Sequence, residues 1–137
     1  MITNTDITIY NRKLNPETRQ YTWHRTELRG VHWYTDQKVQ VLADSKGLSS
    51  ADSINIRIPT GGRSERYLPP EEYAALSYGK KTLYWTVENG DLFVRGIVQD
   101  EIKKESDLQN KHYLVGKVLS HSDNRFGLNP HIRIGGA

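Results

Sequence analysis

Apolar and polar residues alternate with a period of two along much of the chain, which is the pattern of half-buried β-strands. The clearest stretch places Ile54, Ile56 and Ile58 on one face. Pro59 is expected to end this strand, because proline cannot donate a hydrogen bond to a sheet. We therefore expect Ile56, in the middle of the strand, to be buried in the core.

A hairpin is predicted at the start of the chain. Residues 6–10 alternate, and residues 15–18 read Asn-Pro-Glu-Thr, a sequence typical of turns. The return strand is expected over residues 19–28. Gly30 is expected to break that strand, so that residues 31–34 form a separate one.

A second meander is predicted further along the chain. Residues 82–87 alternate, Asn89-Gly90 is a strong hairpin signal, and residues 92–98 form the expected return strand. Gly96 inside that strand indicates a bulge or a bend. Residues 131–134 are expected to close the sheet.

The pattern contains one helix. Residues 70–76 have proline in the first turn and carboxylates at the positive end of the helix dipole. Short strands at close spacing with so little helix predict a mainly β fold. We expect a small antiparallel β-barrel or sandwich with one short helix and long loops, formed as a single domain over residues 1–137.

The longest expected connection covers residues 36–51. Its alternation is weak, and it contains the turn sequence Asp-Ser-Lys-Gly at residues 44–47. We interpret it as a long, partly mobile loop. Loops of this length in a small domain are usually functional or disordered.

The composition restricts the function without assigning it. The 137 residues carry 36% apolar and 26% charged side chains and a net charge of +3, which is typical of one soluble domain. The absence of cysteine excludes disulfides, zinc–thiolate sites and cysteine nucleophiles, and it favours an intracellular origin. No signal peptide and no membrane-spanning run are evident, so no membrane partner is expected.

Catalytic motifs are missing from the sequence. It contains neither a Gly-x-Ser-x-Gly elbow nor a Gly-x-Gly-x-x-Gly loop. Its five histidines lack the spacing of a helical metal pair. We therefore expect no enzyme, with no catalytic residues, no cofactor and no metal.

Aromatic and basic residues leave two interpretations open. Tyr21, Trp23 and Arg25 would share one face of a strand, with Trp33 nearby, and bases could stack on such a platform, as in a nucleic-acid-binding β-barrel. Such a module would use Trp23, Trp33 and the basic loop residues Arg63 and Arg66. Strand aromatics of this kind also serve as core packing.

Charge is unevenly distributed along the chain. Residues 1–30 have a net charge of +2, whereas residues 88–107 have a net charge of −3. Two such surfaces suit head-to-tail association, which can close into a ring, although a mixed, solvated surface is an equally good interpretation. The candidate inter-subunit residues are Arg25, Arg29, Asp100 and Glu101.

Three segments carry a resemblance to known proteins: Ser-Ala-Asp-Ser-Ile-Asn-Ile-Arg-Ile-Pro at residues 50–59, Gly-Asp-Leu-Phe-Val-Arg-Gly at residues 90–96 and Asp-Asn-Arg-Phe-Gly at residues 123–127. The first and the last are the clearest. Together they resemble a family of small proteins encoded in the head–tail module of tailed phages and prophages of Gram-positive bacteria. The same order is similar to the head-closure (stopper) proteins of long-tailed phages.

The resemblance implies a virion structural protein, assembled in the bacterial cytoplasm, that joins head to tail. Such proteins form a homo-oligomeric, six-fold ring below the portal and adaptor, contact tail proteins, and use a loop to retain packaged double-stranded DNA in the channel. A tail terminator is a neighbouring role. The matching loop is 36–51, with candidate residues Lys38, Asp44, Lys46 and Gly47. Segment 60–80 departs from the family pattern as an insertion and offers an alternative channel loop with Gly61, Gly62, Arg63 and Arg66.

Overall fold

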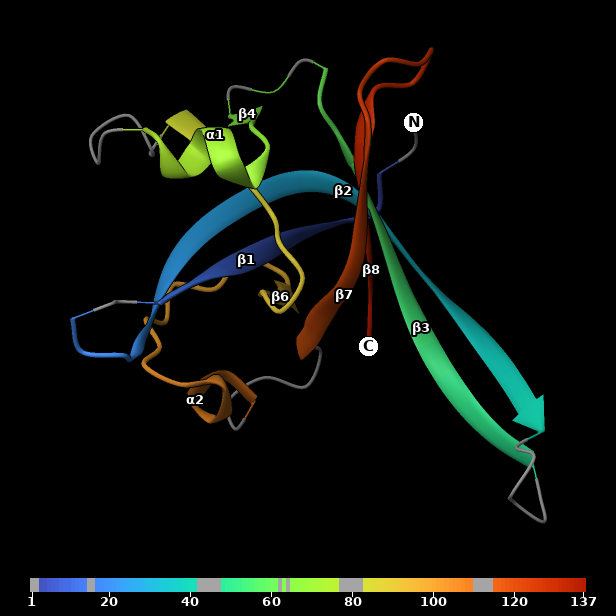
Figure 1. Ribbon diagram of the computed structural model, residues 1–137. Helices are drawn as coiled ribbons and strands as arrows, with labels where there is room; N and C mark the ends of the chain where they lie inside the picture. Colours follow the sequence, from blue (N-terminus) through green and yellow to red (C-terminus); the bar gives the residue numbers. More distant parts are fainter. Residues whose placement is uncertain are drawn as a thin grey trace.

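Six strands close into a barrel in the computed structural model of the chain (Figure 1). The structure describes residues 3–14, 17–41, 48–61, 63, 65–76, 83–109 and 115–137. Neighbouring strands follow the order β1-β2-β3-β8-β7-β6, and β6 pairs with β1 to complete the circle. The predicted mainly β, antiparallel fold is confirmed. The strands of the barrel are β1 (Thr5–Leu14), β2 (Tyr21–Val41), β3 (Leu48–Pro59), β6 (Leu92–Arg95), β7 (Val115–Asn124) and β8 (His131–Gly136).

Gly30 bends a strand instead of ending it, so that prediction is wrong. The separate strands expected around Gly30 are one strand, β2, of 21 residues. Between the pairs Ile7↔Leu28 and Thr5↔Val31, β2 has one residue more than β1. This is a β-bulge, and Gly30 takes the left-handed conformation there with φ +70°. The carboxylate of Asp6 accepts a hydrogen bond from the Gly30 N–H at 2.9 Å, which fixes the bulge.

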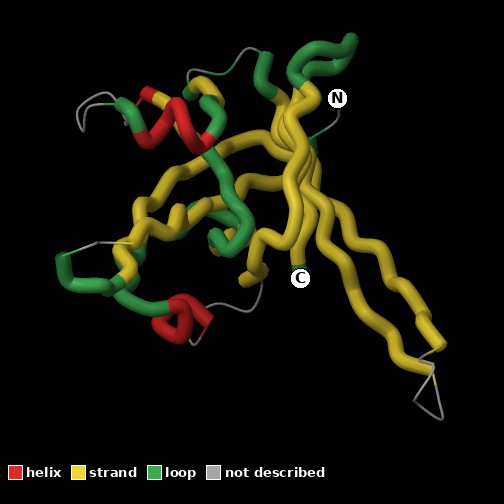
Figure 2. The backbone as a smooth tube through the Cα atoms, viewed as in Figure 1, coloured by secondary structure: helices red, strands yellow, loops and turns green. Residues whose placement is uncertain are grey.

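Strands β2 and β3 continue past the barrel as a two-stranded arm (Figures 1 and 2). The ladder runs without interruption from His32↔Arg57 to Val41↔Leu48. The pairing of β1 with β2 ends at Thr5↔Val31, and that of β3 with β8 ends at Ile54↔Gly136. Most of the segment predicted as a loop over residues 36–51 is therefore strand, and that prediction is wrong for residues 36–41 and 48–51. We call the paired segments 36–41 and 48–53 the arm.

The insertion and the second meander differ in part from expectation. The predicted helix is present as α1 (Pro70–Ala74), and a second short helix, α2 (Glu105–Gln109), adds to the one expected. Strand β5 (Tyr84–Trp85) pairs in parallel with β4 (Arg66–Tyr67) and not with β6. The sequence Asn89-Gly90 is therefore a turn between two different sheets and not the tip of a hairpin.

The hydrophobic core inside the barrel is formed by residues from the beginning, the middle and the end of the chain. Ile56 and Ile58 are fully buried, as predicted, and Ile54 packs at the edge of the same cluster. The ring of Phe93 lies against two glycines of the opposite strands: a Cβ at Gly116 would come within 2.3 Å of the ring, and one at Gly136 within 2.7 Å. Glycine at these two positions lets β7 and β8 approach the buried ring.

Candidate functional site

The arm contains one of the four residues predicted to retain DNA, Lys38. Lys38 lies on β2 and pairs with Ala51 of β3 in the ladder. Asp44, Lys46 and Gly47 lie outside the described residues. The predicted channel loop therefore becomes a two-stranded stalk of the arm that leads away from the barrel (Figure 1).

The alternative channel loop is fastened to the barrel by Arg63. Its guanidinium donates hydrogen bonds to the carbonyl oxygens of Pro59, at 2.7 Å, and Gly30, at 2.9 Å. Burial lowers the pKa of Arg63 from its ordinary value, with nearby Glu65 and Asp6 opposing the shift. Gly61 is exposed, Gly62 lies outside the described residues, and Arg66 belongs to β4. Arg63 thus holds this segment against the bulge at Gly30.

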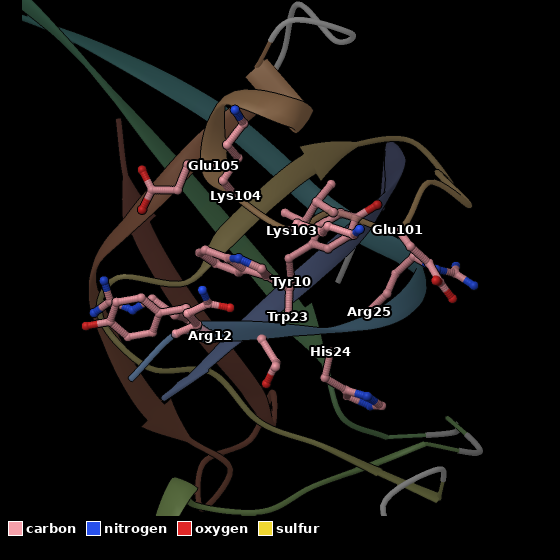
Figure 3. Close-up of a pocket in the computed structure, with 13 residues that line it drawn as sticks. Tyr10, Arg12, Trp23, His24, Arg25, Glu101, Lys103, Lys104 and Glu105 are labelled. Carbon is pink, nitrogen blue, oxygen red and sulfur yellow. The ribbon is translucent and has the colours of Figure 1, made fainter. Parts of the chain in front are cut away.

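A cleft of about 910 Å³ opens beside the β1–β2 hairpin (Figure 3). One wall comes from β1 and β2, and the other from residues 101–105, which lead into α2. Trp23 is half-buried here and packs against the smaller of two hydrophobic clusters, which includes Tyr10 and Leu108. Its Nε1 is buried without a hydrogen-bond partner among the described residues.

The cleft has an excess of positive charge. Four cationic side chains line it against two carboxylates, those of Glu101 and Glu105. Glu105 also pairs with Lys117 at 3.2 Å, which partly neutralises it. Figure 3 shows Tyr10 and Trp23 between two of the cations. The cationic residues are Arg12, Arg25, Lys103 and Lys104.

Two of the residues predicted to meet across subunits lie together within one chain. Arg25 and Glu101 line the same cleft. Arg25 also pairs with Glu27 at 2.5 Å and donates a hydrogen bond to the carbonyl of Val98 at 3.1 Å. The predicted interface of Arg25 and Arg29 with Asp100 and Glu101 stays a prediction, but part of its charge complementarity is satisfied within the subunit. Tyr10 adds a hydrogen bond from its hydroxyl to the backbone carbonyl of Asp100.

The aromatic platform predicted from the sequence forms only in part, because Tyr21, Trp23 and Arg25 line one cleft and Trp33 does not. Trp33 is 6% exposed and packs edge-on against Phe93 in the core, so it cannot stack on a base. Trp23 instead lines the cleft with Tyr21, which is 48% exposed and lies 4.7 Å below the guanidinium of Arg12. Arg12, Lys103 and Lys104 are not among the binding residues expected from the sequence, because only the closure of the barrel brings them together.

Asp91 is a buried anchor that the sequence analysis did not single out as a site. The side chain is 2% exposed, yet its carboxylate accepts hydrogen bonds from the N–H groups of Arg12 and Glu88 and from the amide of Asn11, at 2.8–2.9 Å. Burial raises the pKa of Asp91, and these hydrogen bonds partly oppose the shift. Asp91 thereby ties β1 to the turn that precedes β6.

The turn between β7 and β8 is braced by the side chain of Arg125 and carries exposed apolar side chains. Asp123 binds the guanidinium of Arg125 through two hydrogen bonds of 2.8 Å, which lower the pKa of this carboxyl. Arg125 also lies over the Tyr67 ring at 5.0 Å and donates a hydrogen bond to the Tyr67 carbonyl at 3.3 Å. Beside it, Phe126 is 90% exposed and Leu128 fully exposed. We call residues 125–130 the tip.

Comparison with protein families identifies the family of this chain. Residues 2–137 match a family of unknown function, DUF6751. The chain belongs to the DUF6751 family. No curated protein and no solved structure matches the chain significantly.

The arm, the cleft and the tip all lie within the part of the chain that matches DUF6751. Over the described part of this DUF6751 chain, no three His, Asp or Glu side chains gather as a metal site would require. Among the same residues, no helix is long and apolar enough to cross a membrane. The described residues display three surface features: a projecting arm, a cationic cleft and a tip with exposed apolar side chains.

Proposed function

We propose that the protein is a structural subunit of a tailed-phage virion, a head–tail connector or stopper that forms a homo-oligomeric ring and helps retain packaged DNA. The observation that carries the proposal is the arm. It extends a closed barrel by up to six paired residues on each strand beyond the last contact with β8.

The form of the arm fits a role between subunits. An isolated two-stranded hairpin is marginally stable in water, because it has no hydrophobic face to bury. The arm sequence Asp-Gln-Lys-Val-Gln-Val opposite Leu-Ser-Ser-Ala-Asp-Ser is largely polar. Its outer edges pair with no other described strand. In a ring, such an arm would reach a neighbouring subunit or the central channel.

The charge of the arm region suits a DNA channel. Residues 36–51 contain two aspartates, Asp36 and Asp44, and two lysines, Lys38 and Lys46. A further aspartate, Asp52, follows directly after this segment. The segment 36–51 is therefore neutral. Strong attraction would hold DNA too tightly to pass, and strong repulsion would oppose its entry, because the phosphate backbone responds to both. A neutral arm in a ring would block the channel by its bulk.

Immunogold labelling tests the proposed location. Antibody raised against the purified protein should label the head–tail junction of tailed particles from cells that encode it, with one gold cluster per particle. A matched control uses antibody that has been preabsorbed with the same protein, and it should remove the label. If the antibody labels only the cytoplasm or a nucleoprotein fraction and never the particles, the proposal is contradicted.

The cleft supports a second candidate function, a nucleic-acid-binding β-barrel module. Trp23 lies there among four cationic side chains, which is the combination of aromatic surface and positive charge used to bind single strands. The cleft replaces the Trp33 and Arg63 surface expected from the sequence, since the structure engages both residues elsewhere.

Oligonucleotide binding tests this second candidate. We expect a labelled single strand to bind with an affinity that falls steeply with salt, since each neutralised phosphate adds about −0.7 to the slope of log K against log salt. Lys103→Glu with Lys104→Glu should reduce the affinity at least about tenfold, because two phosphate contacts become repulsions. The control Arg57→Glu changes one exposed cation outside the cleft. Equal losses per reversed charge in the two variants would show binding by net charge alone.

A further inference from the structure

The tip combines rigidity with complete exposure of two large apolar side chains. Phe126 and Leu128 are the two most exposed large hydrophobic residues among those described, at 90% and 102%. The ion pair of Arg125 with Asp123, and the contact of Arg125 with Tyr67, fix the backbone on which they stand. A rigid apolar projection binds with little loss of conformational entropy, which is the property of a preorganised interface anchor.

The tip lies at the far end of the barrel from the arm. On β3, Pro59 pairs with His131 of β8, directly after the tip, whereas Ile54 pairs with Gly136. The arm continues past Ile54, so arm and tip extend from opposite ends of the β3–β8 ladder (Figure 1). A contact made by the tip therefore leaves the arm free.

A small apolar pocket lies elsewhere on the same chain. It has a volume of about 130 Å³ and lies between α1 and the ends of β1 and β2. The buried ring of Tyr73 and the side chains of Pro70 and Ala74 form one side, and Arg12 and Lys13 border the other. An apolar cavity of roughly 150 Å³ is known to accept benzene, so this pocket has the size of one phenyl ring.

The pocket presents a mainly apolar surface although several of its lining residues are polar. Asn11 Oδ1 and Thr86 Oγ1 belong to lining residues, but both atoms are buried beneath that surface. The carboxylate of Asp91 is likewise buried and is held by hydrogen bonds within the chain. An apolar ring therefore fits the surface that the pocket offers.

We propose that the tip is the inter-subunit anchor of the ring, with Phe126 of one copy entering the pocket under α1 of the next copy. The inference rests on the proposed function, because it specifies how the ring subunits join. Tip and pocket are different surfaces, so the contact is heterologous and repeats around a closed ring. In this arrangement the burial of apolar side chains drives assembly. Arg25 and Glu101 then serve the cleft of their own subunit rather than the contact between subunits.

Engineered cysteines test the contact cleanly, because the natural chain has none. Gly127→Cys places a thiol beside Phe126, where an added Cβ meets no atom within 4 Å, and Ala74→Cys places one at the exposed rim of the pocket. When the two single variants are mixed under mild oxidation, we expect a disulfide between the cysteine at the tip of one chain and the cysteine at the pocket of another. Each variant alone should form far less dimer.

A further substitution shows whether Phe126 is the anchor. Adding Phe126→Ser to the Gly127→Cys chain should lower the yield of the mixed disulfide about tenfold or more, since losing an aromatic anchor commonly costs at least that factor. The matched control, Leu119→Ser, removes another exposed apolar side chain, 60% exposed on β7, and should leave the yield unchanged.

Three results would overturn the inference. Tip-to-tip disulfides from Gly127→Cys alone would indicate a symmetric contact, and mixed disulfides insensitive to Phe126→Ser would indicate random collision. Binding of the tip to lipid vesicles without any mixed disulfide would assign it to a membrane surface. If particles are labelled at the neck but the disulfide results fail, the proposed function stands and the proposed contact is wrong. If a Phe126-dependent disulfide forms but particles are not labelled at the neck, the contact stands and the proposed function is wrong.

Discussion

Shortening the arm is expected to leave the barrel folded and to make the virion lose its DNA. The variant replaces residues 40–49 with the two-residue turn Asn-Gly, which joins Val39 to its partner Ser50 in the existing register. The two hydrophobic clusters among the described residues are formed by other parts of the chain. Heads should package DNA and then lose most of it before tails join, so that few particles are infectious.

Three measurements check this result. Thermal unfolding of the purified variant should resemble that of the natural chain, which shows that the barrel is intact. Nuclease-protected DNA should be normal early in assembly and strongly reduced in finished particles, and the infectious titre should fall with it. A control that exchanges Gln40 and Ser49 keeps the length of the arm and should behave like the natural chain. Normal, DNA-filled and infectious particles from the shortened variant would exclude the arm as the retaining element.

Removing the Asp91 carboxylate is expected to be strongly destabilising. Asp91→Ala leaves two backbone N–H groups and the amide of Asn11 without their shared acceptor in a buried place. Each unsatisfied buried donor costs about 1–3 kcal/mol, so the loss in unfolding free energy should be roughly 3 kcal/mol or more. Chemical denaturation of the purified protein measures it, and Glu101→Ala, an exposed carboxylate, is the matched control.

The same group predicts a pH dependence with a defined sign. Burial raises the folded-state pKa of Asp91 above its ordinary value of 3.8. Between those two pKa values the folded state holds more protons than the unfolded state, so the contribution of Asp91 to stability falls as pH rises. The difference in unfolding free energy between the natural chain and Asp91→Ala should therefore be largest at a pH below 3.8, the ordinary pKa. It should become smaller as the pH rises through the folded-state pKa of Asp91. A difference that widens with pH would contradict the raised pKa.

Local periodicity was sufficient to predict much of the barrel from the sequence. The alternation around Ile56 identifies its buried face, because successive side chains of a strand point to opposite sides. Proline and carboxylates at the start of residues 70–76 predict α1 for an equally local reason. The first hairpin follows from turn chemistry, and β1 and β2 pair as expected from it.

Pairing between distant segments was decided only by the tertiary structure. Gly30 reads as a break, but Asp6 binds its N–H and turns the break into a bulge within one strand. The arm has a weak, polar pattern, and only the partner strand shows that residues 36–41 and 48–53 form a ladder. Asn89-Gly90 has the sequence of a hairpin turn, yet β6 finds its partners in β1 and β7 because barrel closure provides them.

The candidate sites depended even more on tertiary structure. Whether Trp23 or Trp33 faces solvent cannot be read from two similar strand aromatics, and closure of the barrel buries Trp33 against Phe93 while Trp23 reaches the cleft. Exposure of Phe126 depends on Asp123 and Tyr67 holding Arg125 beside it. By itself, the sequence determined the mainly β class, the buried face of β3 and the absence of cysteine chemistry. The arrangement of charge, aromatic rings and apolar tip on the surface came from contacts between residues far apart in the chain, which no local pattern encodes.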